Sequence, residues 1–205
     1  MLINRTQRAQ LCDRQQRIRA RDCAPMTDRQ APCIPLAALL AQGEGAFVAR
    51  LGGVVEHSPW VAQRAWMRGP FGSWKSVYEA MAGTIFQATR QEQVALLRAH
   101  PELAGREATA GAMTPDSNAE QGRLGLLALA PGQMARLTAL NARYRGRFGY
   151  PFVVALRLHA SLESVFQSLE ERLAHDASAE LTTALQQVCE VMRGRLLALA
   201  GTLDD

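Results

Sequence analysis

Apolar residues recur every three or four positions along most of the chain from residue 34 onward, which is the period of an α-helix buried on one face. The clearest case is residues 73–89, where Val77, Met81 and Ile85 lie four positions apart. The pattern predicts helices over residues 34–42, 43–56, 57–69, 73–89, 90–100, 117–129, 130–149, 161–176 and 178–201. A chain built almost wholly of such segments belongs to the all-α class.

The ends of these predicted helices carry start and stop signals. Ser58 precedes a proline and has the pattern of an N-cap residue. His100 also precedes a proline, which disfavours α-helical backbone and therefore places this histidine at the end of its helix. Ser117 with Glu120 three positions later matches a capping box, and Gly149 matches a helix stop.

Residues 150–156, YPFVVAL, form the one β-like run of the sequence. A run this short with no partner strand cannot make a sheet. We therefore predict a buried extended segment here. The expected architecture for residues 26–205 is a single compact multi-helix domain, all-α, with this one extended segment.

The composition is ordinary for a globular protein, with 48% hydrophobic and 20% charged residues. No apolar run approaches the roughly 18 residues that a membrane-spanning helix needs. The first residues also lack the apolar core of a secretory signal. These features predict a cytoplasmic protein without a membrane partner.

The formal net charge of +4 is confined to residues 1–25, which carry six arginines and two aspartates. The remainder of the chain is neutral overall, which argues against a nucleic-acid partner for the domain. The basic leader is interpreted as an extension upstream of an initiator at Met26 or as a disordered arm. A transit peptide is a further alternative that the two aspartates disfavour.

The cysteines and the missing motifs narrow the chemistry. The four cysteines, Cys12, Cys23, Cys33 and Cys189, have neither the spacing of a zinc site nor that of a disulfide framework. The sequence contains no G-x-G-x-x-G, P-loop, G-x-S-x-G or H-E-x-x-H motif. If the protein is an enzyme, we expect no bound metal, nucleotide cofactor or covalent serine.

Two residues are the first candidates for chemistry. His100 is either a helix-terminal residue that caps carbonyl groups or an acid/base group held rigidly by the helix end and the following proline. Glu120 is either the acidic partner of a capping box or a group that bonds the polar edge of a ligand bound at the helix start. The sequence leaves both alternatives open.

Other charged residues are weaker candidates. Arg157 and Arg195 are the candidates for binding an anion, and Arg195 is either a surface residue or a buried fork for a planar ligand. His57, which flanks a helix start, is interpreted as structural. His159 and His175 are interpreted as surface residues.

Several motifs taken together resemble one known family. HPELAG is followed by MTPDSNAEQGRLGL and then by LNARYRGRFGYPFVVAL; GVVEHSPWVAQRAW lies upstream and ERLAHDASAELTTALQQV downstream. This combination, over about residues 34–200, resembles 2-oxo-4-hydroxy-4-carboxy-5-ureidoimidazoline (OHCU) decarboxylase, a family that acts between urate and allantoin in purine degradation. Departures are mild: Glu102, Tyr150 and His175 stand where the family more often has aspartate, phenylalanine and asparagine.

The resemblance implies an all-helical homodimer that needs no cofactor and takes OHCU as its small-molecule substrate. It places the catalytic groups on His100, Glu120 and Arg195, with Arg193 as the alternative to Arg195. The implied substrate-binding residues are Pro101, Ser117, Asn118, Ala119, Gln121, Tyr150, Pro151, Phe152, Val153 and Val154.

We hypothesise a decarboxylation in which a ring imine of the substrate accepts the electron pair, so that no cofactor is required. His100 would move the proton, Glu120 would orient His100 or the ureido group, and Arg195 would hold a carboxylate or carbonyl. One alternative is a non-catalytic helical module that binds a purine-derived ligand. Another is a nucleic-acid-binding protein that uses the basic leader.

Overall fold

The computed structural model describes residues 33–105 and 114–203, which fall within one compact unit that begins at Cys33. Within these residues the secondary structure is entirely helical, so the all-α prediction is confirmed. The predicted leader and the predicted start of the domain at residue 26 lie outside the described residues. None of the described helices is long and apolar enough to cross a bilayer.

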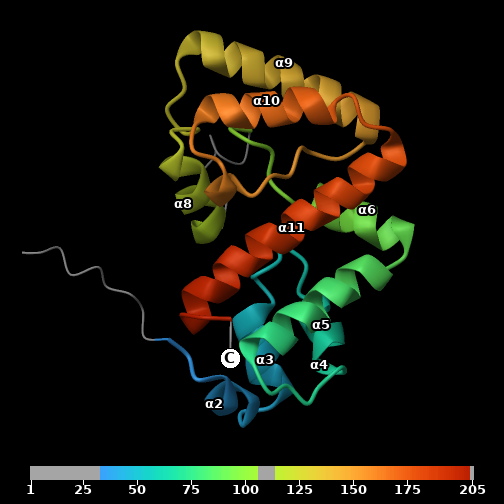
Figure 1. The fold of residues 1–205 in the computed structure, drawn as a ribbon, viewed down its shortest axis with the longest axis vertical. Helices are drawn as coiled ribbons and strands as arrows, with labels where there is room; N and C mark the ends of the chain where they lie inside the picture. The colour runs from blue at the N-terminus through green and yellow to red at the C-terminus, as the bar shows by residue number, and fades with distance from the viewer. Residues whose placement is uncertain (1–32, 106–113, 204–205) are drawn as a thin grey trace, which may run out of the picture. The chain divides into compact units, whose positions relative to one another are not determined.

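The helices follow one another along the chain with short connections (Figure 1). They are α2 (Leu36–Leu40), α3 (Glu44–Leu51), α4 (Trp60–Trp66), α5 (Trp74–Gln87), α6 (Arg90–Arg98), α8 (Pro115–Arg123), α9 (Pro131–Phe148), the 3₁₀ turn η1 (Leu156–Leu158), α10 (Leu162–Arg172) and α11 (Ala177–Ala200).

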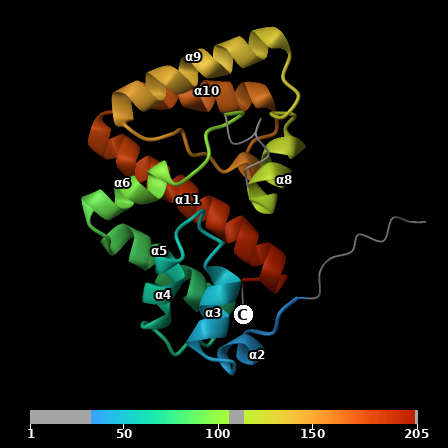
Figure 2. The same cartoon turned by 180° about the vertical axis from the view of Figure 1, so that it is seen from behind.

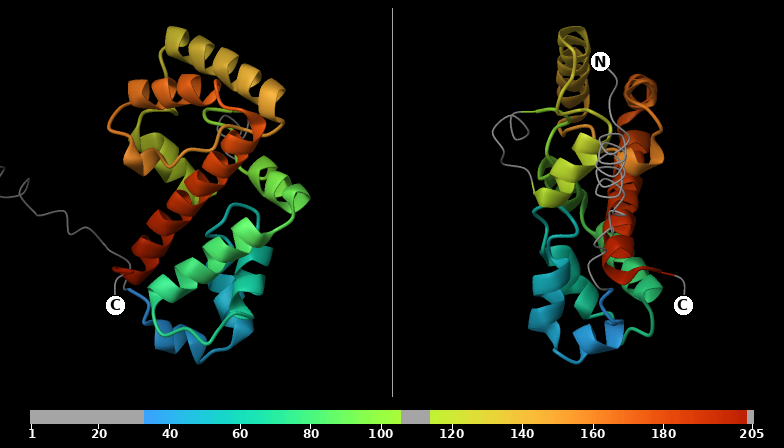
Figure 3. Two further views of the ribbon diagram at one scale, coloured as in Figure 1. Left: turned by 45° about the vertical axis from the view of Figure 1, so that its right-hand side comes forward. Right: turned by 90° about the vertical axis from the view of Figure 1, so that its left-hand side faces the viewer.

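The long C-terminal helix α11 is the central element of the arrangement. It contacts α5, α6 and η1. Helices α3, α4 and α5 pack in sequence at one end, whereas α9 and α10 lie side by side at the other end (Figures 1 and 2). Helix α8 packs against η1. The two further views of Figure 3 show that α11, drawn in red, runs from the end with α9 and α10 toward the end with α3, α4 and α5.

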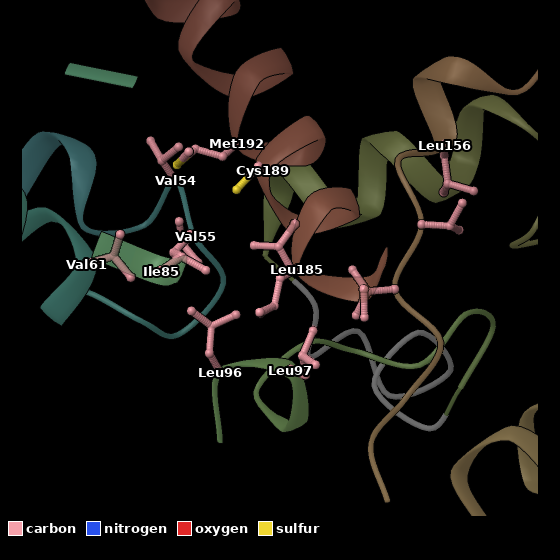
Figure 4. Packing of buried hydrophobic residues seen from close by; sticks show 14 of the residues in the cluster. Val54, Val55, Val61, Ile85, Leu96, Leu97, Leu156, Leu185, Cys189 and Met192 are labelled. Carbon is pink, nitrogen blue, oxygen red and sulfur yellow. The ribbon is translucent and has the colours of Figure 1, made fainter. Parts of the chain in front are cut away.

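The hydrophobic core joins both groups of helices through α11. The face predicted for α5 is confirmed, because Val77, Met81 and Ile85 are all fully buried. Figure 4 shows Ile85 and the α6 residues Leu96 and Leu97 in one cluster with side chains from α11. This cluster fixes α6 against α11, and it therefore fixes the direction in which the chain leaves α6.

The helix boundaries confirm some of the predicted signals and correct others. Gly149 ends α9 in a left-handed conformation with φ of 80°, as predicted. The cap of α4 is Pro59, one residue after the predicted cap at Ser58, and Ser58 makes no side-chain cap. The predicted capping box of Ser117 and Glu120 is wrong, because the cap of α8 is Thr114, three residues before Ser117.

Helix α8 starts earlier because a better start signal precedes the predicted one. The Thr114 hydroxyl accepts the Ser117 N–H at 3.3 Å, and Pro115 takes the first helical position, where its missing N–H is harmless. Ser117 and Glu120 consequently lie inside the helix, one turn apart on the same face.

The predicted extended segment is confirmed over residues 151–155, whereas Leu156, at its predicted end, already belongs to η1. Residues 151–155 have no regular secondary structure, and residues 152–156 are all buried. The segment leads from the end of α9 into η1, close to α8 and α11.

Candidate active site

His100 lies two residues beyond the end of α6 and directly before a proline. Its backbone N–H donates to the Leu97 carbonyl at 3.2 Å, which continues the helical turn. Its ring Nδ1 lies 2.9 Å from the Leu96 carbonyl oxygen. Because a carbonyl can only accept, Nδ1 must carry the hydrogen, and Nε2 of the neutral ring is then the proton acceptor.

The surroundings of His100 favour this neutral ring. Burial lowers the pKa of His100 to about 4, although the bond to Leu96 and the charge of Glu56 act in the opposite direction. The ring does cap a helix carbonyl, as one interpretation of the sequence held, but as a neutral group. At neutral pH the ring is therefore unprotonated and Nε2 carries the lone pair, with lower basicity than an ordinary imidazole.

This environment predicts an unusual titration. The folded protein should keep His100 neutral down to a pH of about 4, whereas the unfolded chain takes up a proton near the ordinary value of 6.5. The contribution of His100 to stability should therefore decrease as the pH falls from 6.5 to 4. NMR titration of the imidazole C–H signals, with His100 assigned from a His100→Gln variant, should show no change for this ring between pH 7.5 and 5. Titration of the ring near pH 6.5 would contradict the lowered pKa of His100 in the folded protein.

Arg195 is the centre of a buried network of charges. Its side chain is only 6% exposed, so of the two alternatives left open by the sequence the residue is buried and does not lie at the surface. Its Nε and Nη2 donate to the two oxygens of Glu120, each at 3.0 Å. Its Nη1 donates to Glu56 Oε2 at 2.9 Å, and its Nη2 also contacts the Ser117 hydroxyl at 3.1 Å.

Glu56 is the functional candidate that sequence reasoning missed. It is fully buried, and its Oε2 accepts hydrogen bonds from Arg195, Thr114 and Ser117. Burial alone would raise the pKa of Glu56, but these hydrogen bonds outweigh it and hold the pKa below the ordinary value. The available signal was a carboxylate placed directly after two buried valines in the quoted motif GVVEHSPW.

A small cavity of about 40 Å³ brings the three predicted catalytic residues together. Its wall is formed by His100, Pro101, Leu103, Ser117, Glu120, Gln121, Phe152, Val153, Val154, Leu156, Val191 and Arg195. Among these, Leu103, Leu156 and Val191 were not predicted. Most of the wall comes from three places: the turn after α6, one face of α8 and the extended segment.

The remaining predicted substrate-binding residues lie elsewhere. Asn118 is exposed, and Ala119 lines a separate cavity of about 710 Å³. Tyr150 and Pro151 line a third cavity, of about 910 Å³. Asn118 and Ala119 face away from the small cavity because of helix geometry. Ser117 faces the cavity, and the residues on the same face of α8 are those three and four positions further along, Glu120 and Gln121.

The small cavity adjoins the two larger ones. His100 also lines the cavity of about 910 Å³, whereas Glu120 and Arg195 also line that of about 710 Å³. A volume of about 40 Å³ is far below the roughly 300–1,000 Å³ of typical ligand pockets. A planar heterocycle can enter only if side chains at one of these shared walls move.

The other candidate residues lie outside the small cavity. Arg157 forms an ion pair with Glu190 at the surface, and Arg193 is exposed, so neither lines the cavity. His159 contacts the Ser164 hydroxyl, whereas His57 is mostly exposed.

His175 is only partly a surface residue. Its Nδ1 lies 2.8 Å from Oε2 of the buried Glu180.

Within the described parts of the chain, no cluster of three His, Cys, Asp or Glu side chains is arranged to hold a metal ion.

Comparison with known proteins gives a consistent result. The family model for OHCU decarboxylase matches residues 41–197. An OHCU decarboxylase from Halalkalicoccus jeotgali is 41% identical over 150 residues, which cover 73% of this chain and 82% of the relative. The mouse (Mus musculus) OHCU decarboxylase is 38% identical over 157 residues, covering 77% and 88%.

The fold is also found among solved structures. A crystal structure of (S)-allantoin synthase superposes with a TM-score of 0.63 at 25% sequence identity, covering 82% of this chain and 55% of that one. The family model spans both the turn that carries His100 and the helix that carries Arg195. The chain therefore belongs to the OHCU decarboxylase family.

Proposed function

We infer that this protein decarboxylates OHCU to (S)-allantoin in urate degradation. The observation that carries this proposal is the shared cavity, in which a neutral imidazole, a buried guanidinium and a carboxylate meet beside an apolar wall. Family membership supports the reaction type, and relatives of this chain carry the decarboxylase name.

The reaction can proceed on the substrate's own electronics. The carbon that loses carbon dioxide also carries a hydroxyl and adjoins a ring C=N bond. When the C–C bond breaks, its electron pair moves into the ring and the ring nitrogen takes a proton from solvent, which leaves an enol. The enol becomes allantoin when its hydroxyl loses a proton and the neighbouring carbon gains one.

His100 is suited to this last transfer. Its neutral ring has Nε2 available as a base, so it can accept the hydroxyl proton and then deliver a proton to carbon from one side of the ring. Delivery from one side makes the product one enantiomer. His100 is thus not a simple proton donor, because its neutral imidazole must accept a proton before it can donate one.

Arg195 is suited to receive a carboxylate or carbonyl oxygen of the substrate after an exchange of partners. Glu120 occupies the Nε and Nη2 edge of the guanidinium and is 34% exposed, whereas Glu56 on Nη1 is fully buried. The substrate would displace Glu120 from this edge, while Glu56 keeps the buried charge compensated. The displaced Glu120 can then accept N–H groups of the ureido chain.

The proposal is tested by adding the protein to freshly generated OHCU and following the circular dichroism of allantoin. Spontaneous decay gives a racemate, so a rapid signal of one sign requires the enzyme. Tight binding of allantoin without any faster release of carbon dioxide would instead support a non-catalytic ligand-binding module.

We also propose, from the resemblance, that the protein is a cytoplasmic homodimer that needs no cofactor. Light scattering of the purified protein tests whether it is a dimer.

Glu120 gives a prediction that separates catalysis from stability. Glu120→Gln keeps the size and part of the hydrogen bonding to Arg195 but removes the negative charge. We expect kcat/KM to fall about 10-fold or more, with little change in the melting temperature, because Glu56 still compensates Arg195. Unchanged kinetics with a lower melting temperature would show that Glu120 acts only as a structural partner.

A further inference from the structure

Residues 152–156 comprise the buried part of the extended segment and the first residue of η1, and all of them except Ala155 line the cavity. No strand lies beside them among the described residues. Side chains therefore take the place of a neighbouring strand. Arg172 Nη1 donates to the Val153 carbonyl at 2.8 Å. The Ala155 N–H donates to Gln187 Oε1 at 2.9 Å. These bonds come from two different helices, α10 and α11.

Arg172 is itself held firmly in place. It is 5% exposed, and its guanidinium lies 4.4 Å from the centre of the Phe152 ring. Its Nε donates to Oε1 of Glu180 at 3.0 Å, and Glu180 also accepts a hydrogen bond from the Tyr144 hydroxyl. A buried charge that leaves its partner is strongly disfavoured, so this arginine has few other positions.

We propose that Arg172 and Gln187 are positioning residues of the active site, which fix the backbone of residues 152–156 and thereby the wall against which the substrate ring lies. The inference rests on the proposed function. Neither residue lines the cavity, so neither acts on the substrate directly. Arg172 acts through Phe152 and Val153, which line the cavity. Gln187 acts through Ala155, whose neighbours Val154 and Leu156 line it.

The expected effect follows from the demands of orientation. A displacement of the wall by about 1 Å can cost on the order of 100-fold in rate, because the reacting atoms lose their alignment. The planar guanidinium reaches Glu180, the Val153 carbonyl and the Phe152 ring at once. A lysine ammonium at the same position keeps the charge but cannot make all three contacts.

The test compares Arg172→Lys and Gln187→Leu with the control Arg136→Lys. Arg136 also lies over a phenylalanine ring, at 4.5 Å from Phe166, and pairs with glutamates, but it is on the surface of α9 and away from the cavity. We expect the first two variants to lower kcat for OHCU by about 10- to 100-fold and to raise KM, with the control unchanged. A reduced folded fraction alone would lower kcat without raising KM.

Hydrogen–deuterium exchange gives a second measurement that does not depend on activity. Peptides that cover residues 150–158 should exchange faster in Arg172→Lys and Gln187→Leu, but not in Arg136→Lys. Unchanged exchange, or faster exchange with normal kinetics, would overturn the inference.

If Arg172→Lys fails to fold, Gln187→Leu decides the outcome, since it removes only one hydrogen bond. If the wild-type protein lacks decarboxylase activity, the proposed function fails, whereas exchange still decides whether these residues hold the segment.

Discussion

Replacing His100 with asparagine should lower kcat for OHCU decarboxylation by about 10²- to 10⁴-fold, the range expected when a general acid/base group is removed. The asparagine amide can still donate to the Leu96 carbonyl, so the turn after α6 should keep its conformation. What the variant loses is Nε2, the only atom of the side chain that can accept and return a proton. Stopped-flow measurement on freshly generated OHCU gives the rate, and the optical rotation of allantoin gives the handedness.

His159→Asn is the matched control for this experiment. His159 bonds the Ser164 hydroxyl through the same ring nitrogen and does not line the small cavity. Its replacement should leave kcat and the product's handedness unchanged. A folded His100→Asn protein with normal rate and normal handedness would remove His100 from the mechanism.

Arg195→Met should cause the largest loss of stability. The variant leaves the fully buried Glu56 without its cation, and breaking a buried pair in this way costs about 3–5 kcal/mol in the free energy of unfolding. Urea unfolding monitored by circular dichroism at pH 7 measures the loss. Activity should fall as well, because the guanidinium edge that receives the substrate is gone.

The pH dependence of the Arg195→Met variant tests the cause. In the wild type the pKa of Glu56 is held low, so acid removes stability once this group takes up a proton. In the variant the hydrogen bond and the charge of Arg195 are missing. Burial, the largest influence on the pKa of Glu56, should then raise it against the remaining hydrogen bonds from Thr114 and Ser117, so that the folded state gains a proton more readily than the unfolded state. The stability difference between the two proteins should therefore shrink as the pH falls from 7 to 5.

Arg157→Met controls for the loss of an arginine as such. Arg157 pairs with Glu190 at the surface, where the two side chains are 36% and 30% exposed, and exposed pairs contribute less than about 1 kcal/mol. A loss of stability in Arg195→Met no larger than in this control would contradict the buried network as a stabilising unit.

Much of the fold follows from the sequence because helix periodicity is a local property. The face of Val77, Met81 and Ile85 could be recognised from spacing alone, and so could the stop at Gly149, where a left-handed residue suits glycine. The start of α8 was misplaced because two overlapping start signals compete there, and only their relative strength in the folded chain selects Thr114.

The sequence by itself determined the helical class, the buried extended segment, the position of His100 before a proline and the family motifs, because each depends on residues that are neighbours along the chain. Only the tertiary structure decided that Arg195 is buried and that Glu56 and Glu120 are both its partners. Those three residues are separated by more than sixty positions along the chain. The pKa of Glu56 is set by its burial and by Arg195, and both exist only once the helices have packed.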